Sequence, residues 1–224
     1  MRRFARPILV LVSLLVLAGL PASANARVDD WQRVVRARHA SAVFTLQDGC
    51  SLMEVFVSAS DGKYVNWGAG VHKQGLLGVL VIVRDACAEP GPKGYPIIYS
   101  ADGMTLDRLR STPRFGRAWV QAGLAATDSS GQEVALRVDL QWAPLGAYQR
   151  SRVSGHGWFP ADGRQGARVN TFSHGMMAPA QAWGSIWIDG AAHHLESTHD
   201  AVLEQVRYAC KVIQHPRGGA DVDC

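Results

Sequence analysis

The chain lacks any apolar run long enough to cross a bilayer as a helix. Its longest nearly pure apolar segment covers 8–20, only thirteen residues, whereas a spanning helix needs about 20. Three arginines precede this segment, and a small-x-small triplet follows it at 24–26. A positive start, a short apolar run and a cleavage pattern together predict a secretory signal peptide over 1–26. We therefore expect a secreted or periplasmic protein with no membrane span after signal removal.

The chain also lacks a marked excess of either charge once the signal peptide is set aside. The whole sequence has 23 Lys+Arg against 19 Asp+Glu, a net charge of +4. Three arginines and no acid lie in 1–26, which leaves 20 basic against 19 acidic residues and a net of +1. No long basic run occurs, and basic and aromatic residues are not interleaved. These absences predict that the protein does not bind nucleic acid.

Short catalytic motifs are missing as well. No Gly-x-Ser-x-Gly elbow, HExxH pair or Cys-x-x-Cys pair occurs in the chain. Ser173 and His174 are adjacent, but neighbours on a strand face opposite ways and cannot form a catalytic dyad. A glycosidase-type carboxylate pair stays open, since any two of 19 acids can meet in space. We expect no catalytic residue and no cofactor, which favours a protein that is not an enzyme.

Alternation of apolar and polar residues is the pattern that the chain has in abundance. It is clearest at 133–142 and weaker at 118–126, and the polar stretch 127–132 joins the two into an expected antiparallel hairpin. The segment 76–83 is apolar on both faces, which is typical of a central strand covered on both sides. Further strands are expected at 40–47, 52–58, 95–99, 152–159, 167–174 and 182–188.

Turn signals separate these segments. Asp and Gly tolerate the positive φ of tight turns, so each Asp-Gly dipeptide predicts a turn. The five dipeptides are Asp48-Gly49, Asp61-Gly62, Asp102-Gly103, Asp162-Gly163 and Asp189-Gly190.

Many short strands with frequent turns predict an all-β fold. We expect one antiparallel β-sandwich domain over 27–213 and a flexible tail over 214–224, with a β-barrel as the alternative. One short terminal helix stays open, at 29–37 or at 201–213. For the second half of 201–213 a strand is favoured.

Four cysteines in an exported protein suggest two disulfides. Cys50 precedes the 52–58 strand and Cys87 follows the apolar strand at 76–85, so antiparallel pairing of these strands brings the two thiols together. Cys210 and Cys224 then remain for a second bond, unless Cys224 is free or links two chains. Zinc ligation and redox chemistry are less favoured, because both prefer Cys-x-x-Cys spacing.

Five histidines offer a metal hypothesis. Imidazole nitrogens can ligate zinc or copper, with Glu196 as an added oxygen ligand. The spacing matches no known ligand pattern, and the adjacent His193 and His194 point to opposite faces of a strand. Incidental surface histidines are the favoured interpretation. The candidate ligands are His156, His174, His193, His194 and His199.

Tryptophans offer a third hypothesis. Five of the seven lie between 119 and 187. Core packing is the usual fate of strand tryptophans, and it is expected for Trp142. Exposed tryptophans on a sheet can instead stack on sugar rings. The candidates for such stacking are Trp119, Trp183 and Trp187, of which Trp119 lies opposite the apolar face of its strand.

Several short phrases carry a resemblance over most of the mature chain. They are Asp48-Gly49-Cys50, Asp85-Ala86-Cys87 and Val138-Asp139-Leu140-Gln141-Trp142, followed by two strands around Arg168 and Trp183. This layout resembles a type of exported bacterial β-protein that has no assigned activity. The resemblance implies an exported β-protein with a disulfide and supplies no catalytic residues. Cys210 and Cys224 are not part of the pattern, so their pairing stays open.

The leading hypothesis is a non-enzymatic binding or structural module of the cell envelope or the extracellular space. Its partner is unknown, with an envelope protein or a glycan as the candidates. The alternatives are a metal-dependent enzyme or metal binder that uses the histidines, and a carbohydrate-binding module that uses exposed tryptophans. The β-architecture suits all three and does not separate them.

Overall fold

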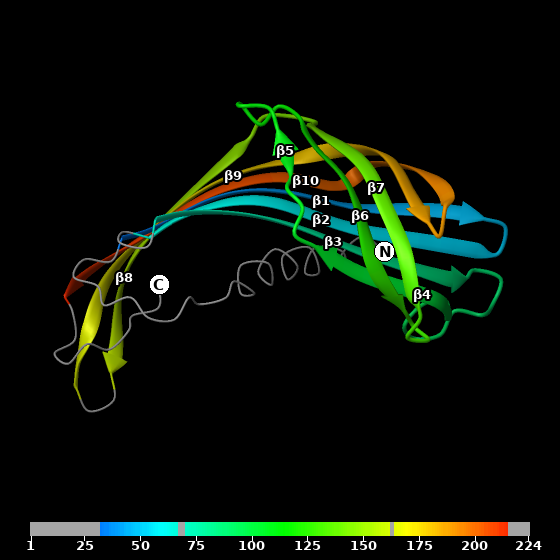
Figure 1. Cartoon of the computed structure of the whole chain (residues 1–224), viewed down its shortest axis with the longest axis horizontal. Coiled ribbons are helices and arrows are strands. Elements are labelled where there is room, and N and C mark those ends of the chain that lie inside the picture. Colours follow the sequence, from blue (N-terminus) through cyan, green and yellow to red (C-terminus); the bar gives the residue numbers. More distant parts are fainter. Residues whose placement is uncertain (1–31, 67–69, 162–163, 215–224) are drawn as a thin grey trace.

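The computed structural model describes residues 32–66, 70–161 and 164–214 (Figure 1). The regular secondary structure of these residues consists of β-strands alone, which confirms the all-β prediction. No described segment is a helix of the length and hydropathy needed to cross a membrane. The strands are β1 (Gln32–Asp48), β2 (Ser51–Asn66), β3 (Gly70–Asp85), β4 (Ile97–Thr105), β5 (Arg110–Ser111), β6 (Ala118–Asp128), β7 (Glu133–Pro144), β8 (Gln149–Ala161), β9 (Arg164–Ile188) and β10 (Ala191–Gln214).

All ten strands belong to one antiparallel sheet that closes on itself. Its order is β10-β1-β2-β3-β4-β6-β7-β9-β8, and β9 also pairs with β10. Eight strands from β10 to β9 therefore form a ring. Opposite parts of the curled sheet face each other, so side chains pack between them as in a sandwich while the strand pairing closes as in a barrel.

The longest strands extend beyond the ring. β9 pairs with β7 through its second half and with β8 through its first half. The far ends of β1, β2, β3 and β10 continue alongside that first half, and Figure 1 shows this part of the sheet reaching away from the ring. We call this six-stranded extension the arm. It comprises 149–161, 164–177, 204–214, 32–39, 60–66 and 70–76.

Apolar side chains fill the ring. Alternate residues of each ring strand point inward, as the period of two requires. Trp142 is fully buried among them, and its indole Nε1 donates a hydrogen bond across the ring to the Ser41 carbonyl at 3.2 Å. The largest other fully buried side chains are Phe44, Phe115, Leu77, Leu140, Ile186, Leu195 and Leu203.

The segment 106–117 crosses the inner face of the sheet where the ring meets the arm. Arg38 donates hydrogen bonds to Ser111 Oγ at 2.7 Å and to the Pro113 carbonyl at 3.1 Å, and its guanidinium lies 5.7 Å from the Phe115 ring centre. Tyr148 donates to the Phe115 carbonyl at 2.6 Å. The arm face that carries Arg38 is therefore continuous with the inner face of the ring.

The expected strands are largely confirmed. The hairpin of 118–126 and 133–142 is β6 and β7, and 76–83 lies in β3 between β2 and β4. Leu77, Val79 and Val81 are buried, whereas the outward residues of that segment are half-buried, so only one face of β3 is fully covered. The segments 167–174 and 182–188 are parts of one strand, β9.

The prediction of a turn at each Asp-Gly dipeptide is confirmed at two positions and wrong at two. Asp48-Gly49 and Asp189-Gly190 form the β1–β2 and β9–β10 turns. Asp61-Gly62 lies inside β2, where pairing with strands on both sides keeps the backbone extended. Asp102-Gly103 lies inside β4, where a Cβ on Gly103 would come within 2.6 Å of the Ala125 carbonyl oxygen. Asp162-Gly163 lies outside the described residues.

The prediction of a short terminal helix is wrong for the described residues. β1 already begins at Gln32 and pairs with β10 and β2, so the helix expected at 29–37 gives way to a strand from 32 onward. The whole of 201–213 is strand within β10, as favoured for its second half. Cross-strand pairing on both sides outweighs the local helical spacing of Val34 and Val35. The signal peptide at 1–26 and all but the first residue of the 214–224 tail lie outside the described residues.

Candidate functional site

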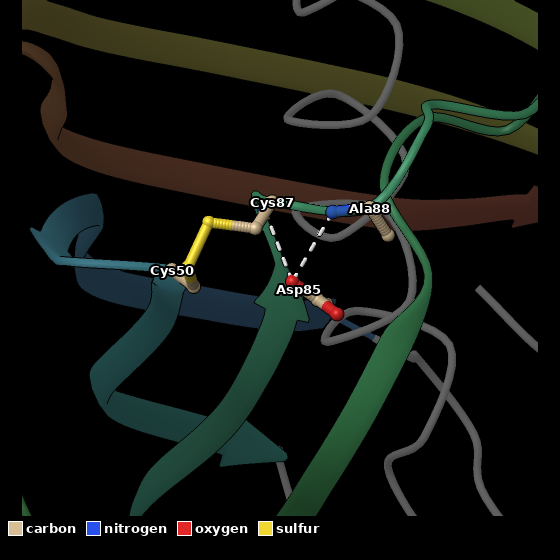
Figure 2. The surroundings of a disulfide bond; sticks show 4 residues. All are labelled: Cys50, Asp85, Cys87 and Ala88. Atoms are coloured by element: carbon tan, nitrogen blue, oxygen red, sulfur yellow. Dashed lines mark hydrogen bonds between the residues drawn. A yellow bond between two sulfur atoms is a disulfide. The ribbon is translucent and has the colours of Figure 1, made fainter.

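The Cys50–Cys87 disulfide is confirmed (Figure 2). Ser51 and Asp85 are register partners, so the cysteines that flank β2 and β3 meet at one edge of the sheet with their Cα atoms 5.0 Å apart. The Asp85 carboxylate accepts hydrogen bonds from the backbone N–H groups of Cys87 at 3.0 Å and Ala88 at 3.2 Å. The bond suits an extracellular or periplasmic location. The Cys210 side chain and Cys224 lie outside the described residues, so their pairing stays a prediction.

The proposed metal ligands lie on separate parts of the sheet. His193 and His194 follow the β9–β10 turn, while His174 pairs with Arg207 in the arm. His156 in β8 contacts Asn170, and His199 is exposed in β10. Among the described residues, the one cluster with metal-ligand geometry is Cys50, Asp85 and Cys87. Its two sulfurs are bonded to each other, so neither is available as a thiolate ligand.

The tryptophans proposed for stacking share one outward face. Trp119 pairs with Gln141, and Gln141 pairs with Trp183 on its other side, so the three lie in one row across β6, β7 and β9. Trp187 lies four residues along β9 from Trp183 and faces the same way. All three tryptophans are half-buried, in contrast to the fully buried Trp142.

Polar side chains surround these indoles. Arg137 places its guanidinium 4.8 Å from the centre of the Trp187 ring, a cation–π arrangement that fixes that ring. Gln121 donates to the Asp139 carboxylate at 3.3 Å, and Gln181 donates to Glu196 at 3.2 Å. We call this outward surface the tryptophan face. It consists of Trp119, Gln121, Arg137, Asp139, Gln141, Trp183 and Trp187.

A buried polar contact lies elsewhere on the outer side of the sheet, between β1, β2 and β10. His39 is 9% exposed, and its Nε2 is 2.9 Å from Ser58 Oγ. Its Nδ1 lies 4.0 Å from the Glu204 carboxylate. Burial lowers the pKa of His39 to about 4 and raises the pKa of Glu204. His39 is therefore uncharged at neutral pH and ties two strands together.

One feature of the arm, a row of basic side chains, was missed by the sequence reasoning. Its members are far apart in the chain and none belongs to a basic run, so only the register brings them together. The local signal that could have indicated it is the alternation of basic residues within single strands, such as Arg36 and Arg38 or Arg150 and Arg152. The row is Lys73, Lys63, Arg36, Arg207, His174 and Arg152, on β3, β2, β1, β10, β9 and β8.

Comparison with known proteins gives one distant likeness. No protein-family model matches the chain, and no curated protein matches its sequence. Among solved structures, an acetoacetate decarboxylase-like enzyme from Sphingomonas wittichii RW1 is similar over 85% of this chain and 94% of that chain, at 12% identity and a TM-score of 0.24. A likeness of that size assigns no activity.

Proposed function

We propose that the protein is an exported, non-enzymatic binding module that takes carbohydrate on its tryptophan face. One observation carries the proposal: three tryptophans leave the core and gather on the same outward surface. Indole rings have large apolar surfaces that are favourably buried, so a half-exposed group of them is available to a ligand. Their flat rings match the apolar faces of sugar rings, and the neighbouring amide and carboxylate groups match sugar hydroxyls.

The spacing of the tryptophans indicates the size of the ligand. Trp183 and Trp187 are four residues apart on β9, which corresponds to roughly 13 Å at 3.3 Å per strand residue. Trp119 and Trp183 are separated by one intervening strand, or roughly 10 Å. A ligand that contacts two of these indoles is therefore an oligosaccharide and not a single sugar.

The described part of the ring interior is packed with apolar side chains. They include Trp142 and Phe44, which are fully buried. No described group of three metal-capable side chains includes a histidine. The tryptophan, amide and carboxylate side chains that could contact a ligand lie on the outer surface of the ring.

The experiment titrates the exported protein with neutral gluco-, xylo-, manno- and chito-oligosaccharides, using tryptophan fluorescence and calorimetry. We expect at least one series to bind, with affinity that rises with chain length up to the span of two indoles. The double variant Trp183→Ala/Trp187→Ala should lose at least tenfold in affinity. Leu106→Ala, which truncates a 72% exposed apolar side chain outside the face, is the matched control and should bind like the wild type.

Two results would overturn the proposal. One is the absence of both heat and fluorescence change across the panel. The other is binding that survives in the folded double variant. The variants should fold, because half-buried indoles are not essential to the core. Circular dichroism and thermal melting of each variant check that it is folded.

A further inference from the structure

The basic row crosses the whole width of the arm. Lys63 is the register partner of both Arg36 and Lys73. Arg207 is in turn the partner of Arg36 and His174, and His174 is the partner of Arg152. Residues directly opposite each other in antiparallel strands point to the same face. One basic residue from each of six strands therefore lies in a single line, which spans roughly 24 Å at about 4.8 Å per strand.

The line lies on the arm face that continues the inner face of the ring. Arg36 is two residues from Arg38, which contacts the segment 106–117 on that face. The tryptophan face is on the opposite side of β9, because Trp183 and Trp187 differ from His174 by an odd number of residues. The row is thus a second, separate surface.

Little on this face neutralises the row. The five lysines and arginines of the row are exposed, and His174 is half-buried. The ion pairs between described residues, His39–Glu204 and Arg84–Glu54, involve none of its members. The next row adds Arg38 and Arg150 against one acid, Asp61. A hollow in the surface lies over the middle of the line, lined by Arg36, His174, Met176, Gln205, Val206 and Arg207.

This arrangement opposes stability. Like charges directly opposite each other in a sheet destabilise it, and Lys73/Lys63, Lys63/Arg36 and Arg36/Arg207 are three such pairs in succession. A sheet face that serves only folding gains from alternating signs. A bound anion removes this repulsion, so the cost in the free protein becomes a gain on binding.

We propose that the basic row binds a linear acidic polysaccharide that lies across the strands of the arm. A single line of cations matches a chain with charges at regular intervals along its length. Guanidinium groups pair bidentately with carboxylates, and lysines add point charges. The Cys50–Cys87 disulfide suits an oxidising compartment outside the cytosol, where such polymers occur.

Two other polyanionic partners fit the row less well. Single-stranded nucleic acid is held by successive bases that stack on several aromatic rings as well as by charge, whereas among the described phenylalanines, tyrosines and tryptophans Phe172 alone lies beside the line. A membrane surface is favoured by apolar side chains that insert beside the basic ones. The large exposed apolar residues of the arm, Val153 and Met177, lie on the opposite face.

The experiment measures binding of polygalacturonate by calorimetry, with the exported full-length protein at low salt and again at 0.5 M salt. The test variant is Arg36→Gln/Lys63→Gln/Arg207→Gln. The matched control removes the same charge from exposed sites outside the row, Lys93→Gln in the loop after the disulfide and Arg114→Gln/Arg117→Gln on the segment 106–117. We expect at least tenfold weaker binding for the test variant, less than twofold for the control, and strong weakening of wild-type binding at 0.5 M salt.

Thermal melting separates this role from a structural one. Without ligand, the test variant should melt above the wild type because the repulsion is relieved, and the single variant Lys63→Gln should show the same direction. Polygalacturonate should raise the melting temperature of the wild type but not that of the test variant. Trp183→Ala/Trp187→Ala should keep full polygalacturonate binding, so failure of the glycan proposal for the tryptophan face leaves this test intact.

The proposal is overturned by equal losses in the test and control variants, since net charge alone would then explain binding. It is also overturned if the wild-type protein shows no binding of polygalacturonate at low salt. Tighter binding of single-stranded DNA or of phosphatidylglycerol vesicles at matched charge concentration would contradict the assignment to a polysaccharide.

Discussion

His39 shows how a single buried residue couples the fold to pH. Its imidazole is almost fully buried against Ser58, and Glu204 lies 4.0 Å away. Burial disfavours the charged form of both ionisable groups, which lowers the pKa of His39 to about 4 and raises that of Glu204. The contact between His39 and Ser58 is therefore a hydrogen bond of the neutral imidazole at physiological pH, and protonation of His39 in acid disfavours it.

The pH dependence of stability follows from that shift. Between about pH 6.5 and pH 4 the unfolded chain protonates His39 while the folded chain does not, so the free energy of unfolding falls as pH falls through this window. At about 1.4 kcal/mol per pKa unit, the loss approaches about 3 kcal/mol. His39→Gln keeps a polar group near Ser58 and removes the titration. Urea denaturation from pH 7 to pH 4 should show the wild type losing stability relative to this variant.

Glu204 acts in the opposite direction, because its raised pKa removes stability as pH rises through the ordinary value of a carboxyl group. The wild type and the His39→Gln variant both keep Glu204, so this effect largely cancels when their stabilities are compared. Stability curves of wild type and His39→Gln that run parallel over the whole range would show that His39 is not the buried group responsible.

At the scale of the element, the end of the ring next to the arm depends on the segment 106–117 lying directly on β3. Gly75 makes room for that crossing. A Cβ at Gly75 would lie 2.5 Å from both Arg108 Cα and the Asp107 carbonyl oxygen, so no side chain fits without moving the backbone. Gly78, three residues along the same strand, faces outward, and a Cβ there would meet only Met104 Cγ, at 3.8 Å.

The two glycines form a matched pair for mutation. Gly75→Ala should destabilise the protein by about 1–3 kcal/mol, because overpacking displaces the crossing segment. Gly78→Ala should be neutral or stabilising by up to about 1 kcal/mol, since the unfolded chain loses freedom and no clash arises. Chemical denaturation of both variants measures the difference. Equal effects at the two positions would mean that the crossing segment does not rest on Gly75.

Local sequence patterns predicted some of the strands and missed other features of the sheet. Period-two patterning identified β6 and β7, because each has one face in the core from end to end. Asp-Gly failed at Gly62 and Gly103, where pairing on both sides holds an extended backbone that no local signal reports. The tryptophan candidates followed from strand alternation. The basic row depends on register across six strands, which adds long-range information that single segments lack.

At the scale of the whole molecule, the disulfide fastens the edge of the ring that lies farthest from the arm. It joins the ends of β2 and β3, which also run into the arm at their other ends. Cys50 and Cys87 are 37 residues apart, so the bond restricts a sizeable loop of the unfolded chain. Strands that are far apart in the sequence pair at a cost in chain entropy, and the disulfide lowers that cost because it already restricts the unfolded chain.

Removing the bond should lower stability without altering either proposed surface. Cys50→Ser/Cys87→Ser should lose roughly 4 kcal/mol by the chain-entropy relation for a loop of this length. The folded variant should retain its oligosaccharide and polygalacturonate affinities, because both faces lie away from the sheet edge. Guanidinium denaturation and the same calorimetry measure these quantities. A stability change near zero would show that the bond does not constrain the unfolded chain as expected.

The proposed binding of carbohydrate to the tryptophan face is best tested by calorimetric titration of the wild type and of Trp183→Ala/Trp187→Ala with the neutral oligosaccharide panel. We expect saturable binding of an oligosaccharide by the wild type, reduced at least tenfold in the double variant. Wild-type protein that binds no member of the panel, or a folded double variant that binds as tightly, would contradict it.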